Sequence, residues 1–165
     1  MAMTGKALPA SPDFLPREEA ATLDLEHFLP YRLSLLSNRI SQTIADLYAE
    51  RFGIGVTEWR VIAVLGRYAG LSANEVAERT AMDKVAVSRS VASLLEKGLL
   101  LRALDGADRR RSLLRLSRNG QRLHAQVAPL ALDIERRLLE QLDADDRRHL
   151  ARMLDALDRA VDRLP

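Results

Sequence analysis

The stretch that decides the fold is Asp83-Lys-Val-Ala-Val-Ser-Arg-Ser-Val-Ala-Ser-Leu-Leu-Glu-Lys-Gly98. Its apolar residues recur at steps of three and four, at Val87, Val91, Leu94 and Leu95. This spacing predicts an amphipathic helix over 83–98. Asp83 is a good N-cap, because its carboxylate can accept hydrogen bonds from the free backbone N–H groups of the first turn. Gly98 then favours the end of the helix.

The residues just before this helix predict a shorter one. Ser72-Ala-Asn-Glu75 is a capping box, in which the serine hydroxyl and the glutamate carboxylate each bind a backbone N–H at a helix start. The helix that it opens should end near Thr80, so that only a tight turn separates it from Asp83. Two helices joined in this way are typical of a helix-turn-helix motif.

The residues just after the 83–98 helix predict a hairpin. Leu99–Leu104 and Ser112–Leu116 are largely apolar, and the segment between them is polar and contains a glycine. This pattern predicts two antiparallel strands. Helix, turn, helix and hairpin in this order predict a winged helix-turn-helix lobe over 57–117, with a recognition helix at 83–98 and a wing at 99–116.

Further helices are predicted on both sides of this lobe. Helical spacing begins at Pro30, and Thr57 is a good N-cap for a second helix. Ser117 should cap a long helix that reaches about Leu142 and bends at Pro129, and Asp143 should cap the last helix. The expected fold class is mainly α with a small β-hairpin wing, as a winged helix-turn-helix lobe with a helical dimerisation region. The other expected domains are a partly ordered N-terminal extension at 1–29, a dimerisation helix in 30–56 and C-terminal dimerisation helices at 118–165.

The composition excludes several kinds of chemistry. The 165-residue chain has 25 Lys and Arg against 23 Asp and Glu, a formal net charge of +2, and no cysteine. The lack of cysteine excludes disulfides, thiolate zinc sites, cysteine nucleophiles and thiol-based redox sensing. The sequence has neither an apolar run of about 18 residues nor the layout of a signal peptide, so we expect a cytoplasmic protein without a membrane partner.

The positive charge is concentrated in one segment. Residues 83–122 carry 10 Lys and Arg against 4 Asp and Glu, a net of +6, whereas 1–82 and 123–165 each have a net of −2. A segregated basic block is expected of a surface that faces phosphate, so the small overall charge does not argue against a nucleic-acid partner. The alternative is an arginine-rich surface that is simply solvated.

The side of the 83–98 helix away from its apolar stripe carries small residues around one arginine. Small side chains let a helix enter the major groove of DNA closely, where arginine can form two hydrogen bonds with guanine O6 and N7. Val85 and Ala86 could contact thymine methyl groups. The candidate DNA contacts from this pattern are Lys84, Val85, Ala86, Arg89 and Ser93. The alternative is an ordinary amphipathic surface helix with a solvated arginine.

The predicted wing has a basic tip formed by Arg109, Arg110 and Arg111. A basic tip on a narrow ribbon can enter a minor groove, whose negative potential favours arginine. Asp108 lies two residues from Arg110, close enough to hold that guanidinium in one direction. We therefore interpret Arg110 as the inserted residue and Asp108 as its orienting partner. A solvated run of charges is the alternative.

These segments together resemble the core of MarR-type transcriptional regulators. The residues that carry the resemblance are the 83–98 stretch, Leu99-Leu-Leu-Arg102, Asp105-Gly-Ala-Asp108-Arg-Arg110 and Leu114-Arg-Leu-Ser117-Arg-Asn-Gly120. The resemblance implies a homodimer whose first, fifth and sixth helices entwine, with two lobes on a palindromic operator in double-stranded DNA. By position it also implies that Ser88 and Arg89 contact the major groove and that Arg110, braced by Asp108, contacts the minor groove. Val85-Ala86 departs from the pattern, because many relatives have a hydroxyl there.

The last predicted helix supports dimerisation independently. Its apolar stripe consists of Leu150, Leu154, Leu157, Val161 and Leu164. A C-terminal helix with such a face needs a partner surface to cover it. The alternative is that the stripe packs within its own chain.

The resemblance also implies release from DNA by a small aromatic acid or phenol. A pocket for such an effector needs apolar walls, an aromatic face and a cation for a carboxylate. The candidate ligand-binding residues are Tyr31, Arg32, Arg39, Trp59 and Arg60. The alternatives are core packing for the tryptophan and structural ion pairs for the arginines.

Other classes of function have little support in the sequence. His27, His124 and His149 are scattered without the spacing of a metal site, so we expect no metal and no cofactor. No nucleophile elbow, phosphate-binding glycine loop or metal-ligand cluster indicates an enzyme. We therefore expect a ligand-responsive DNA-binding repressor. The alternative is a winged-helix module that makes protein contacts without ligand control.

Overall fold

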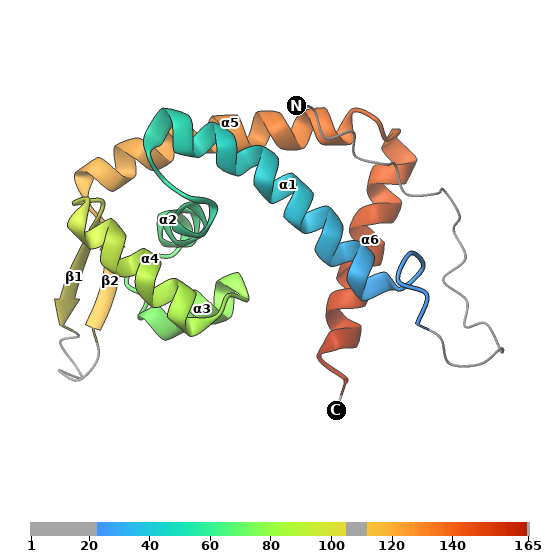
Figure 1. Ribbon diagram of the computed structural model, residues 1–165, viewed down its shortest axis with the longest axis horizontal. Helices are drawn as coiled ribbons and strands as arrows, with labels where there is room; N and C mark the ends of the chain where they lie inside the picture. The colour runs from blue at the N-terminus through green and yellow to red at the C-terminus, as the bar shows by residue number, and fades with distance from the viewer. Residues whose placement is uncertain (1–22, 105–111, 165) are drawn as a thin grey trace. The chain divides into compact units, whose positions relative to one another are not determined.

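The computed structural model describes residues 23–104 and 112–164 (Figure 1). Its elements in chain order are α1 (Leu29–Phe52), α2 (Val56–Arg67), α3 (Ala73–Thr80), α4 (Lys84–Glu96), β1 (Leu100–Leu104), β2 (Ser112–Leu116), α5 (Arg118–Leu139) and α6 (Ala144–Val161). The expected fold class is confirmed, because helices dominate and the two described strands form one small antiparallel hairpin. The chain divides between Val56 and Thr57 into two compact units.

Four predicted helix caps are present. The Ser72 hydroxyl accepts from the Glu75 backbone N–H at 3.3 Å, and the Glu75 carboxylate accepts from the Ser72 N–H at 2.7 Å. Asp83 Oδ1 accepts hydrogen bonds from the backbone N–H groups of Val85 and Ala86, at 2.8 and 3.1 Å. Ser117 and Asp143 cap α5 and α6 in the same way. These contacts join residues two or three apart, which is why the sequence alone could predict them.

Two kinds of helix end differ from the prediction. Thr57 was predicted as an N-cap, but it is the second residue of α2, which begins at Val56. Glu58, in the same first turn, is buried and contacts the end of α4. α4 ends two residues before Gly98, whose backbone φ of +66° already leads the chain away into β1.

The core of the lobe lies where α2, α3, α4 and the hairpin meet. β1 and β2 pair from Leu100↔Leu116 to Leu104↔Ser112, and α4 packs against α3 and β1 (Figure 1). The apolar side chains that are 2% exposed or less are Val61, Ile62, Leu65, Val76, Val87, Val91, Leu94, Leu100 and Leu114. Burial of one such side chain stabilises the fold by about 1.5–3 kcal/mol. This core decides which side of α4 is left outside.

The turn between α3 and α4 contains a backbone conformation that is unusual for its residue. Ala81, the C-cap of α3, has φ +50°, in the left-handed region. A side chain with a Cβ pays about 1–2 kcal/mol for this conformation, which glycine adopts freely. The backbone N–H of Ala81 binds carbonyl oxygens of α3, and this closes the helix before the turn.

α1 and α6 have little buried surface of their own. α1 buries Tyr48, and this burial raises the pKa of the Tyr48 phenol above its ordinary value. α6 has no buried residue; Leu154 and Val161 on it are 49% and 64% exposed, and Leu164, just after it, is 70% exposed. Among the described residues no helix is both long and apolar enough to cross a membrane.

Candidate nucleic-acid interface

The N-terminal half of α4 presents its candidate residues to the outside. Lys84, Ser88 and Arg89 are exposed, Val85 is 55% exposed, and Ala86 is half-buried. The opposite side of the helix is held in the core. The carboxylate of the capping residue Asp83 accepts hydrogen bonds from backbone N–H groups of the first turn. The arrangement leaves a narrow helix face with small side chains and two cations, which suits entry into a major groove.

The C-terminal half of α4 is held by a buried carboxylate from α2. Glu58 is 7% exposed and accepts hydrogen bonds from the Ser93 hydroxyl at 2.7 Å and from Lys97 Nζ at 2.8 and 2.9 Å. The hydroxyl proton of Ser93, a candidate DNA contact, is therefore used inside the protein. Sequence reasoning missed this cluster, because Ser93 and Lys97 lie 35 and 39 residues from Glu58 along the chain.

The described part of the wing carries two exposed arginines. Arg102 on β1 lies opposite Leu114, and Arg115 on β2 lies opposite Leu101. The other candidates on the wing, Asp108, Arg109, Arg110 and Arg111, lie outside the described residues. Because successive residues of a strand alternate between its faces, Arg102 and Arg115 lie on opposite faces of the hairpin.

Two further arginines of the lobe gather on one tyrosine. The Arg79 guanidinium carbon lies 4.3 Å from the centre of the Tyr68 ring, and that of Arg67 lies 5.3 Å from it. Each such cation–π contact at an exposed site is worth about 0.5–1 kcal/mol. No local sequence pattern indicates this group, because its two arginines belong to α2 and α3, on opposite sides of a turn.

The ligand-binding candidates fall into two groups. Trp59 stacks on the His124 ring of α5, with ring centres 5.7 Å apart and planes inclined by 28°. The same imidazole lies against Gly66, where an added Cβ would come within 2.5 Å of Nε2. Trp59 of α2 thus packs against α5, and Arg60 beside it is half-buried. Tyr31, Arg32 and Arg39 belong to α1, in the other compact unit, and Tyr31 is 40% exposed.

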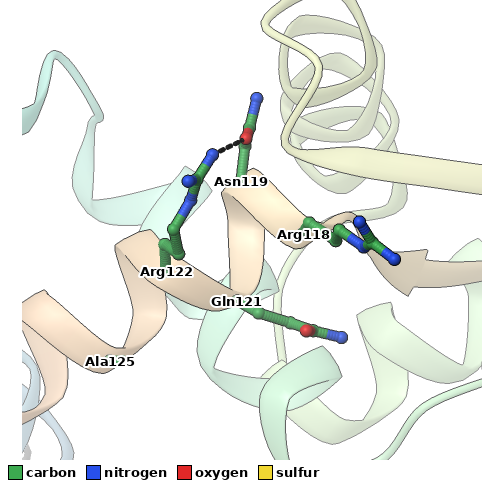
Figure 2. A pocket seen from close by; sticks show the side chains of 5 residues that line it. All are labelled: Arg118, Asn119, Gln121, Arg122 and Ala125. Carbon is green, nitrogen blue, oxygen red and sulfur yellow. Dashed lines mark hydrogen bonds between the residues drawn. The ribbon is translucent and has the colours of Figure 1, made fainter.

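A hollow of about 650 Å³ lies along the first turns of α5 (Figure 2). Its described lining consists of Arg118, Asn119, Gln121, Arg122 and Ala125. The Arg122 guanidinium donates a hydrogen bond to the Asn119 side-chain oxygen. This lining is polar and comes from one helix, unlike the apolar walls and aromatic face that suit an aromatic acid.

Two of the histidines have side-chain contacts. His27 Nδ1 lies 2.8 Å from Asp24 Oδ2, and this hydrogen bond holds the pKa of the Asp24 carboxyl below its ordinary value. His124 packs on α2, as described above. In the ranges 23–104 and 112–164, no three or more histidine, aspartate or glutamate side chains gather in a way that could hold a metal ion.

A helix-turn-helix followed by an antiparallel hairpin defines a winged-helix protein. A sequence model described as the MarR family matches residues 52–111. A MarR/EmrR family transcriptional regulator from Acinetobacter sp. ADP1 has a similar structure, with a TM-score of 0.79 and 29% identity over 86% of this chain and 100% of that one. The chain has the winged-helix fold of MarR-family transcriptional regulators, and its lobe matches the sequence model of that family.

Other solved structures agree with this assignment. A MarR family regulator from Silicibacter pomeroyi DSS has a TM-score of 0.74 and 25% identity over 88% of this chain and 97% of that one. MepR from S. aureus, solved as a complex with DNA, has the same fold with a TM-score of 0.73 and 23% identity over 81% of this chain and 98% of that one. No curated protein matches the chain in sequence.

Proposed function

We propose that this protein is a homodimeric DNA-binding transcriptional regulator, a cytoplasmic repressor that a small aromatic acid or phenol releases from a palindromic operator. The observation that carries the proposal is the exposed N-terminal half of α4, where small residues surround Arg89 in a MarR-family winged-helix lobe. The fold that the chain shares with MepR, solved as a DNA complex, supports it. The concentration of positive charge in residues 83–122 also supports it, because a basic surface attracts the DNA phosphates.

In this proposal α4 enters the major groove by its N-terminal half. Arg89 binds a guanine through O6 and N7, and Val85 and Ala86 lie against thymine methyl groups. Lys84 reaches a phosphate, and Ser88 binds at the groove edge. The Ser93 oxygen can only accept a hydrogen bond from DNA, because its hydroxyl already donates one to Glu58. Arg109, Arg110 and Arg111 follow the minor groove beside it, with Asp108 orienting Arg110.

We also propose that α1, α5 and α6 form the dimer. The exposed apolar stripe of α6 supports this, because Leu154 and Val161 have no cover within the described chain. Two lobes related by a two-fold axis would place their recognition helices about 34 Å apart, one turn of DNA. That spacing matches a palindrome with half-sites on one side of the duplex.

The effector in this proposal contacts Tyr31, Arg32, Arg39, Trp59 and Arg60 in the dimer. A thermal-shift screen of the full-length protein against aromatic acids and phenols tests it. A ligand at 100 times its Kd stabilises the native state by about 2.7 kcal/mol, which raises the melting temperature by several degrees. Binding should also quench the single tryptophan, Trp59. Failure of every aromatic acid and phenol to shift melting would contradict the effector class.

The DNA-binding proposal is tested with fragments of the genome from which the gene comes. The protein should select a fragment with a palindrome and bind it with a Kd of about 10⁻⁸ to 10⁻¹¹ M. The affinity should fall steeply between about 50 and 200 mM salt, because phosphate contacts release counterions. Arg110→Ala should weaken binding while the protein stays dimeric. Equal affinity for the selected palindrome and a scrambled duplex at both salt concentrations would overturn the proposal.

A further inference from the structure

The Glu58 carboxylate is buried and is not itself a proposed DNA contact. The carboxylate comes from the first turn of α2, and both of its oxygens bind the end of α4. Its partner Lys97 is the C-cap of α4, with a side chain that is 39% exposed, whereas the Glu58 side chain is 9% exposed. A buried carboxylate needs such partners, because an uncompensated charge in the protein interior is strongly destabilising.

The partners of Glu58 lie in one row with the main candidate for base recognition. Arg89, Ser93 and Lys97 follow each other at steps of four residues, which places them along one side of α4. The rise of an α-helix puts Ser93 about 6 Å from Arg89 along the axis. The anchored end of this row and the exposed end that would read bases are therefore separated by one helical turn.

We propose that Glu58 is a positioning residue that determines DNA specificity without touching DNA. It fixes the C-terminal half of α4 through Ser93 and Lys97 and thereby aims Arg89 at its base. This inference rests on the proposed function and adds to it a residue outside the contact surface.

The contacts of Glu58 with α4 are directional hydrogen bonds, unlike the other contacts that hold this helix. Val87, Val91 and Leu94 hold the helix by apolar packing, which has little directionality and tolerates small rotations of the helix. The bonds to Glu58 have lengths of 2.7, 2.8 and 2.9 Å and fix the rotation of α4 about its axis. Two hydrogen bonds from arginine to guanine need such alignment, whereas phosphate contacts by flexible side chains need less of it.

The ion pair with Lys97 also offsets the negative charge of the Glu58 carboxylate, which would otherwise repel DNA. Lys97 neutralises Glu58 within the lobe, so α2 adds no unpaired negative charge near the basic surface. Glu58→Gln removes that charge and keeps the shape of the side chain. Lys97→Met removes the ammonium group and keeps an unbranched chain. The two substitutions therefore disturb the same contact with opposite changes of net charge.

The experiment compares affinities for the selected operator and for a scrambled duplex, measured by fluorescence anisotropy. It uses the full-length dimer, with circular dichroism and light scattering as checks of folding and assembly. We expect Glu58→Gln and Lys97→Met each to lower the ratio of the two affinities about tenfold, the scale of one lost base contact. The double variant should lose little more, because both changes break one contact.

Two matched variants control for charge and for simple loss of stability. Glu96→Gln makes the same chemical change at an exposed residue of the last turn of α4 and should keep the parental ratio. Lys97→Arg keeps a cation within reach of Glu58 and should also keep it. A purely structural role of Glu58 would lower the melting temperature and leave the ratio of the folded dimer unchanged. Lys97→Met supplies the same comparison by itself if Glu58→Gln does not fold.

The outcomes separate this inference from the proposed function. A parental ratio near one would overturn the proposed function, and the inference with it. A specific parent together with folded variants that keep the parental ratio would overturn the inference alone. A specific parent with lower ratios in Glu58→Gln and Lys97→Met, but not in Glu96→Gln, would support both.

Discussion

α4 and α6 carry apolar stripes of the same helical spacing, but the two stripes have different surroundings. In α4, Val87, Val91 and Leu94 are at most 1% exposed, and α3 and β1 pack against the helix. In α6, Leu154 and Val161 are 49% and 64% exposed, and no residue of the helix is buried. The spacing thus identifies a face that needs cover, whereas the structure shows whether the described chain itself supplies it. We attribute the cover of α6 to a second copy of the chain.

The largest expected effect comes from a charge placed in the stripe of α6. Leu154→Asp should convert the dimer to an 18.4 kDa monomer and weaken operator binding by about 100-fold or more, because two linked lobes bind far more tightly than one. Light scattering and anisotropy measure the two effects. Ala156→Asp adds the same charge away from the stripe and should leave both unchanged. A dimeric Leu154→Asp would mean that α6 is covered in another way.

A matched pair of alanine substitutions compares the two stripes directly. Leu94→Ala should lower the free energy of unfolding by about 2–5 kcal/mol, because it opens a cavity in the lobe core. Leu154→Ala should instead make the melting temperature more dependent on protein concentration, since it weakens association. Chemical denaturation at two protein concentrations distinguishes the cases. The comparison fails if both variants change stability in the same, concentration-independent way.

The next effect concerns the exposed side of α4. Arg89→Ala should cost about 1–3 kcal/mol of operator binding and relax the preference at one base pair of each half-site. The unfolding free energy should stay near that of the parent, because the Arg89 side chain is exposed. Anisotropy with operators substituted at each base pair measures the preference. An unchanged preference would place base recognition elsewhere in the lobe.

The smallest expected effect is a stabilisation in the turn that precedes α4. Ala81→Gly should raise the free energy of unfolding by up to about 1 kcal/mol, because glycine adopts the φ of +50° without the steric cost that alanine pays. Gly has a larger entropy in the unfolded chain, which offsets part of this gain. Denaturation by urea measures the difference. A loss of stability would mean that this unfolded-state entropy outweighs the relieved strain.

The sequence alone predicts features that depend on neighbours along the chain. The capping residues Ser72 and Asp83 act on backbone groups two or three residues away, and the strand Ser112–Leu116 follows from its own composition. The apolar stripe of α4 is likewise local, so the outward position of Arg89 could be inferred before the structure was known.

The features that the sequence did not indicate depend on residues that are distant along the chain. Glu58 is buried because Ser93 and Lys97 approach it from α4, and no local pattern predicts that contact. The stacking of Trp59 on His124 likewise needs α5 to return to α2. The prediction of Thr57 as a cap was wrong, because α2 begins one residue earlier, at Val56.

The most direct test of the account is protection of guanine N7 in the operator from methylation. Bound protein should protect guanines in the major groove of both half-sites, with the two protected positions about 34 Å apart. Arg89→Ala should remove that protection at a concentration at which it still occupies the operator. Full protection in the complex with Arg89→Ala, or none with the parent, would contradict the placement of α4 in the major groove.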